Sequence, residues 1–409
     1  MGMNRLWQTL DRPFFVLAPM EDVTDTVFRR CIRRWSQAWG SHGPDVMFSE
    51  FTRVDGAVKA WENEVSLRGR EDGGYGGPIR ETAALRRGEA LRRGAVRETP
   101  ALRRGPAARR DRLVYTAEER PVVAQLWGTR PDEFYSAARA VEELGFDGID
   151  LNMGCPVQKI RKAGACSALI GNPSLAGEMV AACRSASTLP LSVKTRIGLD
   201  RVVTEEWIGF LLELNLDAIT VHGRIADQLS EGSADWSEVG RAVALRNASG
   251  STTAIIGNGD VRSLAEGYRR VEETGVDGVM IGRGVFSDPL LFTRRHQGGG
   301  AAGRSRKPGP PLWHEIPLPR RLLYLREQIV AFTDHWGDRR NYEILKKFFR
   351  NYVCVSADSG GGEKVPCDTA NRQLSQHQGA AAELLEELYE THDAGAALVI
   401  LDRVIGFIG

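Results

Sequence analysis

The chain has 409 residues, of which 42% are hydrophobic and 26% are charged, and its formal net charge is +1. This composition is ordinary for a soluble globular protein, and the small net charge gives no global electrostatic argument for a nucleic-acid partner. The length allows two or three domains, because a barrel of parallel strands and helices can fill about 250 residues as one domain.

Signals for export, membrane insertion or metal binding do not stand out. The six cysteines form neither the Cys-x-x-Cys pairs of a zinc site nor the density of a secreted disulfide scaffold. The first ten residues lack the apolar core of a signal peptide, and no run of about 18 apolar residues follows. We therefore expect a cytoplasmic protein with no membrane span and no bound metal.

From residue 14 onward one unit recurs: a short β-rich apolar run, a loop, and a stretch with helical spacing. The predicted strands cover residues 14–20, 46–51, 122–128, 148–154, 191–197, 218–224, 254–260 and 278–282. The predicted helices that follow include residues 24–35, 132–144, 174–187, 204–214, 236–245 and 263–274.

The eight units predict an α/β fold, a (β/α)8 TIM barrel over residues 1–296. The connections are too long for hairpins, which indicates parallel strands with an active face at their carboxyl ends. A doubly wound open sheet is the alternative, although no G-x-G-x-x-G motif follows the first strand.

Residues 66–113 interrupt this pattern. An Ala-Leu-Arg-Arg-Gly sequence occurs there three times, and residues 68–112 contain 13 arginines, no lysine and 6 acids, a local balance of +7. With few large apolar residues, the segment cannot bury enough surface to offset its ordering entropy. We expect a disordered insertion, and its composition fits an inert loop and an RNA-contacting arm about equally.

A Gly/Pro-rich linker, residues 297–311, precedes the C-terminal part of the chain. Helical spacing recurs over 322–336, 342–352, 381–388 and 396–405, which predicts a small helical domain over residues 312–409, called the tail below. On its second helix Lys346, Lys347 and Arg350 are interspersed with aromatic residues. We expect the aromatic residues to face the core and the cations to face solvent.

The segment 148–156, Gly-Ile-Asp-Leu-Asn-Met-Gly-Cys-Pro, is the most informative stretch of the sequence. The period of two places Asp150 and Asn152 on the inner face of a strand, and Cys155 lies just past its end. Pro156 prevents continuation of the strand and favours an extended backbone at Cys155. A small buried cysteine beside a turn is the simpler interpretation, so the rest of the site must decide.

The same period places further polar residues near the predicted barrel mouth, the end formed by the carboxyl ends of the strands. Each alone has a structural interpretation, but a barrel interior is normally filled with Val, Ile and Leu, so several together favour a site. A single histidine without neighbouring ligands is a weak zinc signal. The six residues are Gln125, Asn152, Lys194, Arg196, His222 and Arg224.

The last two strands end in glycine-rich sequences, residues 257–260 (Gly-Asn-Gly-Asp) and 282–284 (Gly-Arg-Gly). Glycines let backbone N–H groups approach a phosphate closely, and Arg283 adds a charged donor. Phosphate sites after strands seven and eight recur in this barrel. These sequences therefore predict a phosphate-bearing cofactor.

Six motifs, in matching order and spacing, together resemble the tRNA-dihydrouridine synthases. They lie at residues 18–25 (APMEDVTD), 151–156 (LNMGCP), 192–196 (SVKTR), 221–224 (VHGR), 257–260 (GNGD) and 281–284 (IGRG). The resemblance covers about residues 14–296 apart from the insertion, and more faintly the tail, which is similar to the family's tRNA-gripping domain. Residues 50–54 (EFTRV) resemble the bacterial C-type branch.

The resemblance implies an enzyme that uses FMN and NADPH or NADH to reduce specific uridines of tRNA to 5,6-dihydrouridine. Cys155 would be the proton donor, and Asn152 and Arg196 would orient the target uracil. We expect tRNA as the partner and a monomeric enzyme. The residues implied to hold FMN are Pro19, Met20, Glu21, Gln125, Lys194, His222, Asn258, Gly259, Asp260, Gly282 and Arg283.

The residues allow this chemistry. Hydride delivery to C6 of uracil leaves negative charge toward C5, and a thiol with an ordinary pKa near ~8.5 is mostly protonated at neutral pH and can supply the proton. Two alternatives stay open. One is a flavin barrel similar to dihydroorotate dehydrogenase that acts on a free small molecule, with Cys155 as a base. The other is a non-catalytic RNA-binding flavoprotein.

Overall fold

The computed structural model describes residues 6–71, 111–294, 311–354 and 378–408. Most of the predicted insertion and nearly all of the predicted linker lie outside these ranges. The described ends of the insertion are helical, since α3 (Val54–Glu71) continues to residue 71 and a 3-10 turn covers Asp111–Leu113. The bounds of the insertion stay a prediction.

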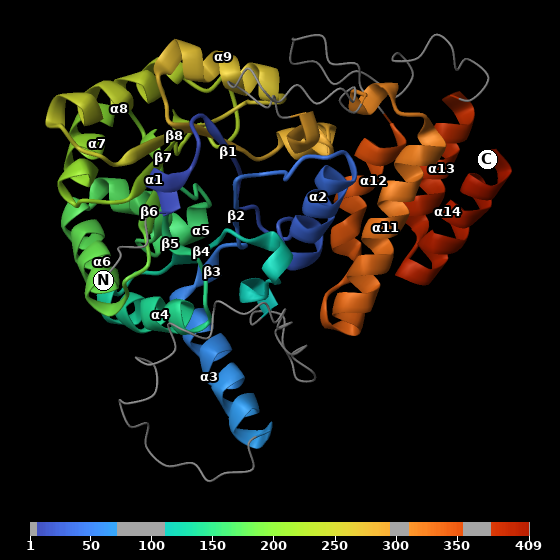
Figure 1. The fold of residues 1–409 in the computed structure, drawn as a ribbon, viewed down its shortest axis with the longest axis horizontal. Coiled ribbons are helices and arrows are strands. Elements are labelled where there is room, and N and C mark those ends of the chain that lie inside the picture. Colours follow the sequence, from blue (N-terminus) through green and yellow to red (C-terminus); the bar gives the residue numbers. More distant parts are fainter. Residues whose placement is uncertain (1–5, 72–110, 295–310, 355–377, 409) are drawn as a thin grey trace.

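Parallel strands form a closed barrel (Figure 1). The ring closes because β2 pairs with both β1 and β4, which excludes the open sheet, and β3 (Thr52–Arg53) adds a short pairing to β4. The TIM barrel prediction is confirmed. The eight strands of the ring are β1 (Phe14–Leu17), β2 (Val46–Phe48), β4 (Val122–Trp127), β5 (Gly148–Met153), β6 (Leu191–Gly198), β7 (Ala218–Ile225), β8 (Ala254–Asn258) and β9 (Gly278–Ile281).

Helices surround the barrel, and their apolar faces pack on the strands to form one large core. At the amino-terminal end of the strands, Trp7 of α1 (Leu6–Thr9) is buried against the rings of Phe14 and Phe48. The surrounding helices are α2 (Thr26–Ala38), α3, α4 (Pro131–Glu143), α6 (Pro173–Ala186), α7 (Thr204–Glu213), α8 (Trp236–Ser249) and α9 (Leu264–Thr274). Short helices at the mouth and 3-10 segments elsewhere are α5 (Gln158–Lys162), α10 (Gly284–Ser287), η4 (Ala117–Glu119), η5 (Cys166–Gly171), η6 (Leu291–Arg294), η7 (Trp313–Glu315), η8 (Gly337–Arg339) and η9 (Tyr342–Leu345).

The tail lies beside α2 (Figure 1). Aromatic rings make this contact: Phe348 stacks on Phe28 of α2 at 5.2 Å and on Phe286 of α10 at 5.3 Å between centroids. The aromatic residues of the second tail helix are buried as predicted. In the described part of the chain, every helix is too short or too polar to cross a membrane. The tail helices are α11 (Leu318–Trp336), α12 (Lys346–Val353), α13 (Gln378–Glu390) and α14 (Ala394–Ile408).

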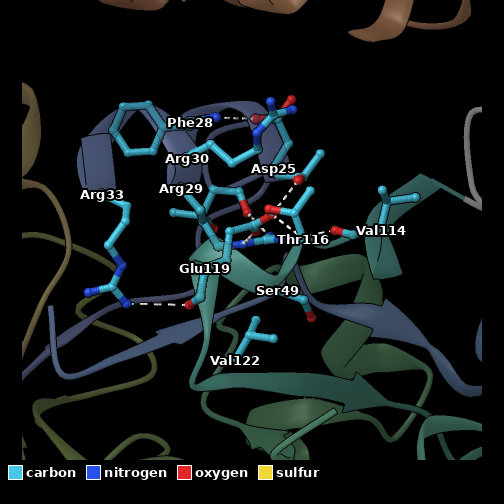
Figure 2. Close-up of polar contacts among 12 residues, drawn as sticks. Asp25, Phe28, Arg29, Arg30, Arg33, Ser49, Val114, Thr116, Glu119 and Val122 are labelled. Carbon is cyan, nitrogen blue, oxygen red and sulfur yellow. Dashed lines mark hydrogen bonds and ion pairs between the residues drawn. The ribbon is translucent and has the colours of Figure 1, made fainter. Parts of the chain in front are cut away.

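A buried ion pair joins α2 to the segment that leads into β4 (Figure 2). Arg29 Nε donates to Glu119 Oε2 at 2.6 Å, and neither side chain is exposed. Arg29 also donates to the carbonyls of Thr24 and Val114, at 2.6 and 2.7 Å, and Glu119 accepts from the N–H of Thr116 at 2.7 Å. The pair is well satisfied, which is what makes a buried charge tolerable.

We expect Glu119→Ala to lower the free energy of unfolding by about 3–5 kcal/mol, because Arg29 would stay buried without its counter-charge. Chemical denaturation monitored by tryptophan fluorescence would measure the change. Asp132→Ala is the matched control, since it removes the partner of Arg130 from an exposed ion pair. Equal effects of the two substitutions would contradict a structural role for the buried pair.

Candidate active site

A chain of hydrogen-bonded side chains runs through the barrel interior to the mouth. Ser192 Oγ donates to Asp150 Oδ1 at 2.6 Å, and Gln125 Nε2 donates to Asp150 Oδ2 at 2.7 Å. Gln125 Oε1 in turn accepts from Asn152 Nδ2 at 3.1 Å. Each of these hydrogen bonds therefore fixes the orientation of the next side-chain amide. Both polar atoms of the Gln125 amide already have a partner, so the predicted contact with a flavin ring would have to share one of them.

Asn152 determines the direction of the backbone after β5. Its Oδ1 accepts from the backbone N–H groups of Gly154, at 3.1 Å, and Cys155, at 2.9 Å. An asparagine that bonds the N–H groups following it closes a local turn, so the strand ends here. Arg196 Nε donates to the carbonyl of Gly154 at 2.8 Å and holds the same turn from β6. Asn152 and Arg196 thus lie next to Cys155.

Cys155 is half-buried, and its thiol hydrogen-bonds that of Cys166. This hydrogen bond outweighs burial and, with the nearby charge of Arg196, lowers the pKa of Cys155 to about 7. The expectation of a mostly protonated thiol at neutral pH is therefore too simple. Near pH 7 the group is divided between thiol and thiolate.

Lys194 is half-buried in the barrel and donates to Asn258 Oδ1 at 2.9 Å. Asn258 Nδ2 donates to the carbonyl of Met280 at 2.8 Å, which fixes the amide. Burial, helped by the charge of Arg196, lowers the pKa of Lys194 to about 8. The side chain of Asn258 therefore positions the lysine, and a phosphate contact at this residue would have to come from its backbone.

A second polar cluster lies across the mouth on β7 and the loops after β8 and β9. Arg224 is buried and contacts both His222 Nε2, at 3.2 Å, and Asp260 Oδ2, at 2.6 Å. Because the guanidinium is a donor only, Nε2 accepts and the ring proton sits on Nδ1. Burial and the surrounding cations lower the pKa of His222 far below its usual range, so its imidazole is neutral.

Asp260 holds this cluster together. Its carboxylate accepts from Arg224, from the N–H of Ala234 at 2.8 Å and from Arg283 at 3.2 Å. Burial raises its pKa, but the hydrogen bonds and the two cations outweigh burial and lower it overall. The carboxylate is therefore a brace for Arg283, and only the backbone of Asp260 could meet a phosphate.

Gly259 has φ +128°, and a Cβ there would come within 2.6 Å of the Ala234 side chain. Only glycine fits this position. At the neighbouring end, a Cβ on Gly282 would lie 3.6 Å from the sulfur of Met20. The loop after β8 thus packs closely on the segment before α8, and the loop after β9 lies against the loop after β1.

The loop after β1 carries Pro19, Met20 and Glu21, all half-buried at the mouth. The N–H of Met20 donates to Thr24 Oγ1 at 2.8 Å. Glu21 forms an ion pair with Arg112, at the end of the insertion. The structure thus brings all predicted site residues to one end of the barrel, although not all of them touch one another.

Four residues that hold the site were not predicted from the sequence, and only one of them had a usable signal. Ser192 follows the inward period of its strand. Within the described residues, no group of three or more His, Cys, Asp or Glu side chains could hold a metal ion. The four residues are Arg112, Cys166, Ser167 and Ser192.

Comparisons with known proteins agree with the motifs. The model of the dihydrouridine synthase (Dus) family matches residues 16–325. A protein of Bacillus subtilis (strain 168), named probable tRNA-dihydrouridine synthase 2, is 34% identical over 353 residues, 86% of this chain and 88% of that protein. A protein of Staphylococcus aureus (strain MRSA252), named probable tRNA-dihydrouridine synthase, is 31% identical over 352 residues, 86% of this chain and 87% of that protein.

Among solved structures, morphinone reductase aligns with 71% of this chain and 87% of its own, with a TM-score of 0.42 and 11% sequence identity. A similarity at this level says nothing about function. The family match and the two relatives each cover most of the chain, and they agree with one another. The chain therefore belongs to the dihydrouridine synthase family, as its motifs predict.

Proposed function

We propose that this protein reduces uridines of tRNA to 5,6-dihydrouridine, with FMN as its cofactor, NADPH or NADH as the reductant and Cys155 as the proton donor. Membership of the family supports the reaction class. The observation that carries the assignment of roles is the position of Cys155, which the turn at Asn152 holds at the mouth beside Arg196.

The residues at the mouth fit a flavin with a phosphate. Gly259 and Gly282 follow the neighbouring strands β8 and β9, and Arg283, braced by Asp260, supplies a cation at the same end of the barrel. Lys194 adds a half-buried cation in the barrel, which suits negative charge on a reduced cofactor. Bound FMN would supply the hydride for C6 of the uracil.

The chain's own residues then have separate tasks. Asn152 and Arg196 orient the uracil and hold the loop of Cys155, and the Cys155 thiol delivers the proton to C5. A general acid works best when its pKa is close to the operating pH, and a value of about 7 meets this condition. A single uracil has to leave its stack to reach these groups inside the barrel mouth.

The tail favours tRNA over a free small molecule as the substrate. Lys347 Nζ donates to the carbonyl of Asp22 at 2.7 Å, so the basic face of α12 lies next to the loop that carries Met20 and Glu21. Arg350 is exposed on the same helix. A molecule that reaches the mouth would therefore pass cations suited to phosphates.

Assignment to the C-type branch stays a prediction, as do the cytoplasmic location and the monomeric state. The EFTRV sequence at residues 50–54 has a structural explanation that does not depend on the modified tRNA position. Glu50 is buried, accepts from the N–H of Asp22 at 2.8 Å and pairs with Arg340 of the tail at 2.5 Å.

Cys155→Ala should leave FMN binding and flavin reduction by NADPH intact, because neither needs an acid at this position. Reoxidation of the reduced flavin by unmodified tRNA should slow by about 10²–10⁴-fold, the usual contribution of a general acid. Stopped-flow absorbance of the two half-reactions would measure both steps. Equal slowing of the two, or loss of flavin, would contradict the proton-donor assignment.

The rate of the tRNA step should depend on pH through Cys155. The donor must be protonated, so the rate should be level below pH 7 and fall by about tenfold per pH unit well above it. Burial lowers the pKa of Lys194 to about 8, and this residue is proposed to contact the flavin, so its effect should appear in flavin reduction as well. A pH profile measured separately for each half-reaction distinguishes the two, and a tRNA step that stays level to pH 9 would contradict the assignment.

Arg283→Ala should weaken FMN binding by about 1.5–3 kcal/mol, the range for a hydrogen bond to a charged group. Fluorescence titration of the flavin-free protein with FMN would measure this, with riboflavin, which lacks the phosphate, as the comparison. The affinity for riboflavin should not change. Unchanged FMN affinity would place the phosphate elsewhere.

A further inference from the structure

Cys155 has a second thiol beside it that the proposed reaction does not use. Cys166 begins η5, is completely buried, and hydrogen-bonds the Cys155 thiol. Ser167 donates to the Cys155 carbonyl through its Oγ, at 2.8 Å, and through its N–H, at 3.4 Å. The two bonds from Ser167 thus hold η5, which begins at Cys166, against the backbone of Cys155.

The backbone at Cys166 is unusual. Its φ is +55°, a left-handed conformation that residues with a Cβ rarely adopt. A residue in this conformation persists only where its surroundings impose it, and such positions gather at functional sites. Here the conformation belongs to the turn between α5 and η5, which returns the chain to Cys155 after a loop over the barrel mouth.

Cys155 differs from the buried free thiols in the properties that matter for oxidation. Cys155 is accessible at the mouth, and its pKa is lowered to about 7, so a reactive thiolate is present at neutral pH. Cys31 and Cys183 are buried free thiols whose pKa burial raises, to about 12 for Cys183. Of the free thiols in the described residues, Cys155 is the one that an oxidant in solution should attack first.

We propose that Cys155 and Cys166 form a modification site for hydroperoxides, in which Cys155 is oxidised and Cys166 closes a disulfide onto it. Formation of the disulfide depends only on this geometry. Its effect on activity rests on the proposed function: the disulfide removes the proton donor and stops the tRNA step until a thiol reductant restores it.

The reaction balances with hydrogen peroxide as the oxidant. The Cys155 thiolate attacks one peroxide oxygen, the O–O bond breaks, and the hydroxide released takes up the former thiol proton as water, which leaves a sulfenic acid. The Cys166 sulfur attacks the Cys155 sulfur, the S–O bond breaks, and hydroxide leaves with the Cys166 proton as a second water. The two thiols are oxidised by two electrons, and one peroxide is reduced to two waters.

The position of Cys166 beside Cys155 also gives this buried thiol a protective role. A sulfenic acid without a neighbouring thiol is open to further oxidation to the sulfinic acid, which ordinary thiol reductants do not reverse. A resolving thiol already in contact with Cys155 would compete with that step, and a disulfide can be reduced again. Cys166 would therefore protect the residue on which the proposed reaction depends.

The test compares the wild type with Cys166→Ser after treatment of the flavin-free protein with hydrogen peroxide. Free thiols are alkylated, and tryptic peptides are analysed by mass spectrometry. Lys159, Arg161 and Lys162 lie between the two cysteines, so trypsin places them on separate peptides and a cross-link is visible directly. Peptides are needed because Cys354 is already disulfide-bonded, which makes the mass of the intact protein ambiguous.

In the wild type we expect cross-linked peptides that carry Cys155 and Cys166, and their loss on treatment with dithiothreitol. In Cys166→Ser we expect sulfenic and sulfinic acids at Cys155 without a cross-link. Cys183→Ser is the matched control, a buried thiol away from the pair, and should behave as the wild type. Cys166→Gly is a second variant that suits the φ of +55°, and circular dichroism checks that both variants fold.

Oxidation of wild-type Cys155 to the sulfinic acid as fast as in Cys166→Ser, with no cross-link, would overturn the proposal. Measurements of tRNA reduction distinguish a failure of this proposal from a failure of the proposed function. Peroxide should abolish tRNA reduction in both proteins, and dithiothreitol should restore it in the wild type alone. A cross-link that leaves tRNA reduction unchanged would keep the thiol pair and refute Cys155 as the proton donor. No cross-link, together with a slow tRNA step in Cys155→Ala, would keep the proposed function and refute the pair.

Discussion

The two hydrogen bonds that Asn152 accepts are the constraint on which the site depends. They turn the chain at the end of β5, so that Cys155 leaves the strand direction at the mouth of the barrel. Asn152 can do this only because its amide is itself oriented, through Gln125 and the buried carboxylate of Asp150. Burial raises the pKa of Asp150 to about 6, which is the cost of placing this acceptor in the core. A polar chain inside the barrel thus helps to support the loop that carries Cys155.

The cationic side chains around the mouth act together on the pKa of His222. Lys194, Arg196, Arg224 and Arg283 each lower the pKa of His222, which burial lowers first. The imidazole is therefore a neutral hydrogen-bonding group and no proton carrier. The same excess of cations suits the anions that the proposed reaction brings to the mouth, a phosphate and a developing negative charge. In the proposed function, binding of an anionic cofactor and control of protonation would thus have one electrostatic origin.

The period of two along the strands was enough to predict the barrel and the residues that face its mouth, because a buried strand has only two faces. It could not predict which partner each side chain takes. Asn258 and Asp260 lie where the motifs place them, yet their side chains support Lys194 and Arg283. Cys166 had no periodic signal, since a left-handed turn in a loop returns it to Cys155.

The link between the tail and the barrel has a consequence for how a long substrate is placed. Glu50 accepts from the N–H of Asp22 and pairs with Arg340, while Lys347 donates to the carbonyl of Asp22. The peptide groups of the loop after β1 are thereby held from both the barrel and the tail. A tRNA bound by the tail would be held at a fixed position relative to the loop that carries Met20, a residue of the proposed flavin site. Because the ion pair of Glu50 with Arg340 is buried, it resists solvent screening better than surface ion pairs do. Under the proposed function, the distance between the tail and Cys155 is therefore fixed by the fold and does not have to be set by the RNA.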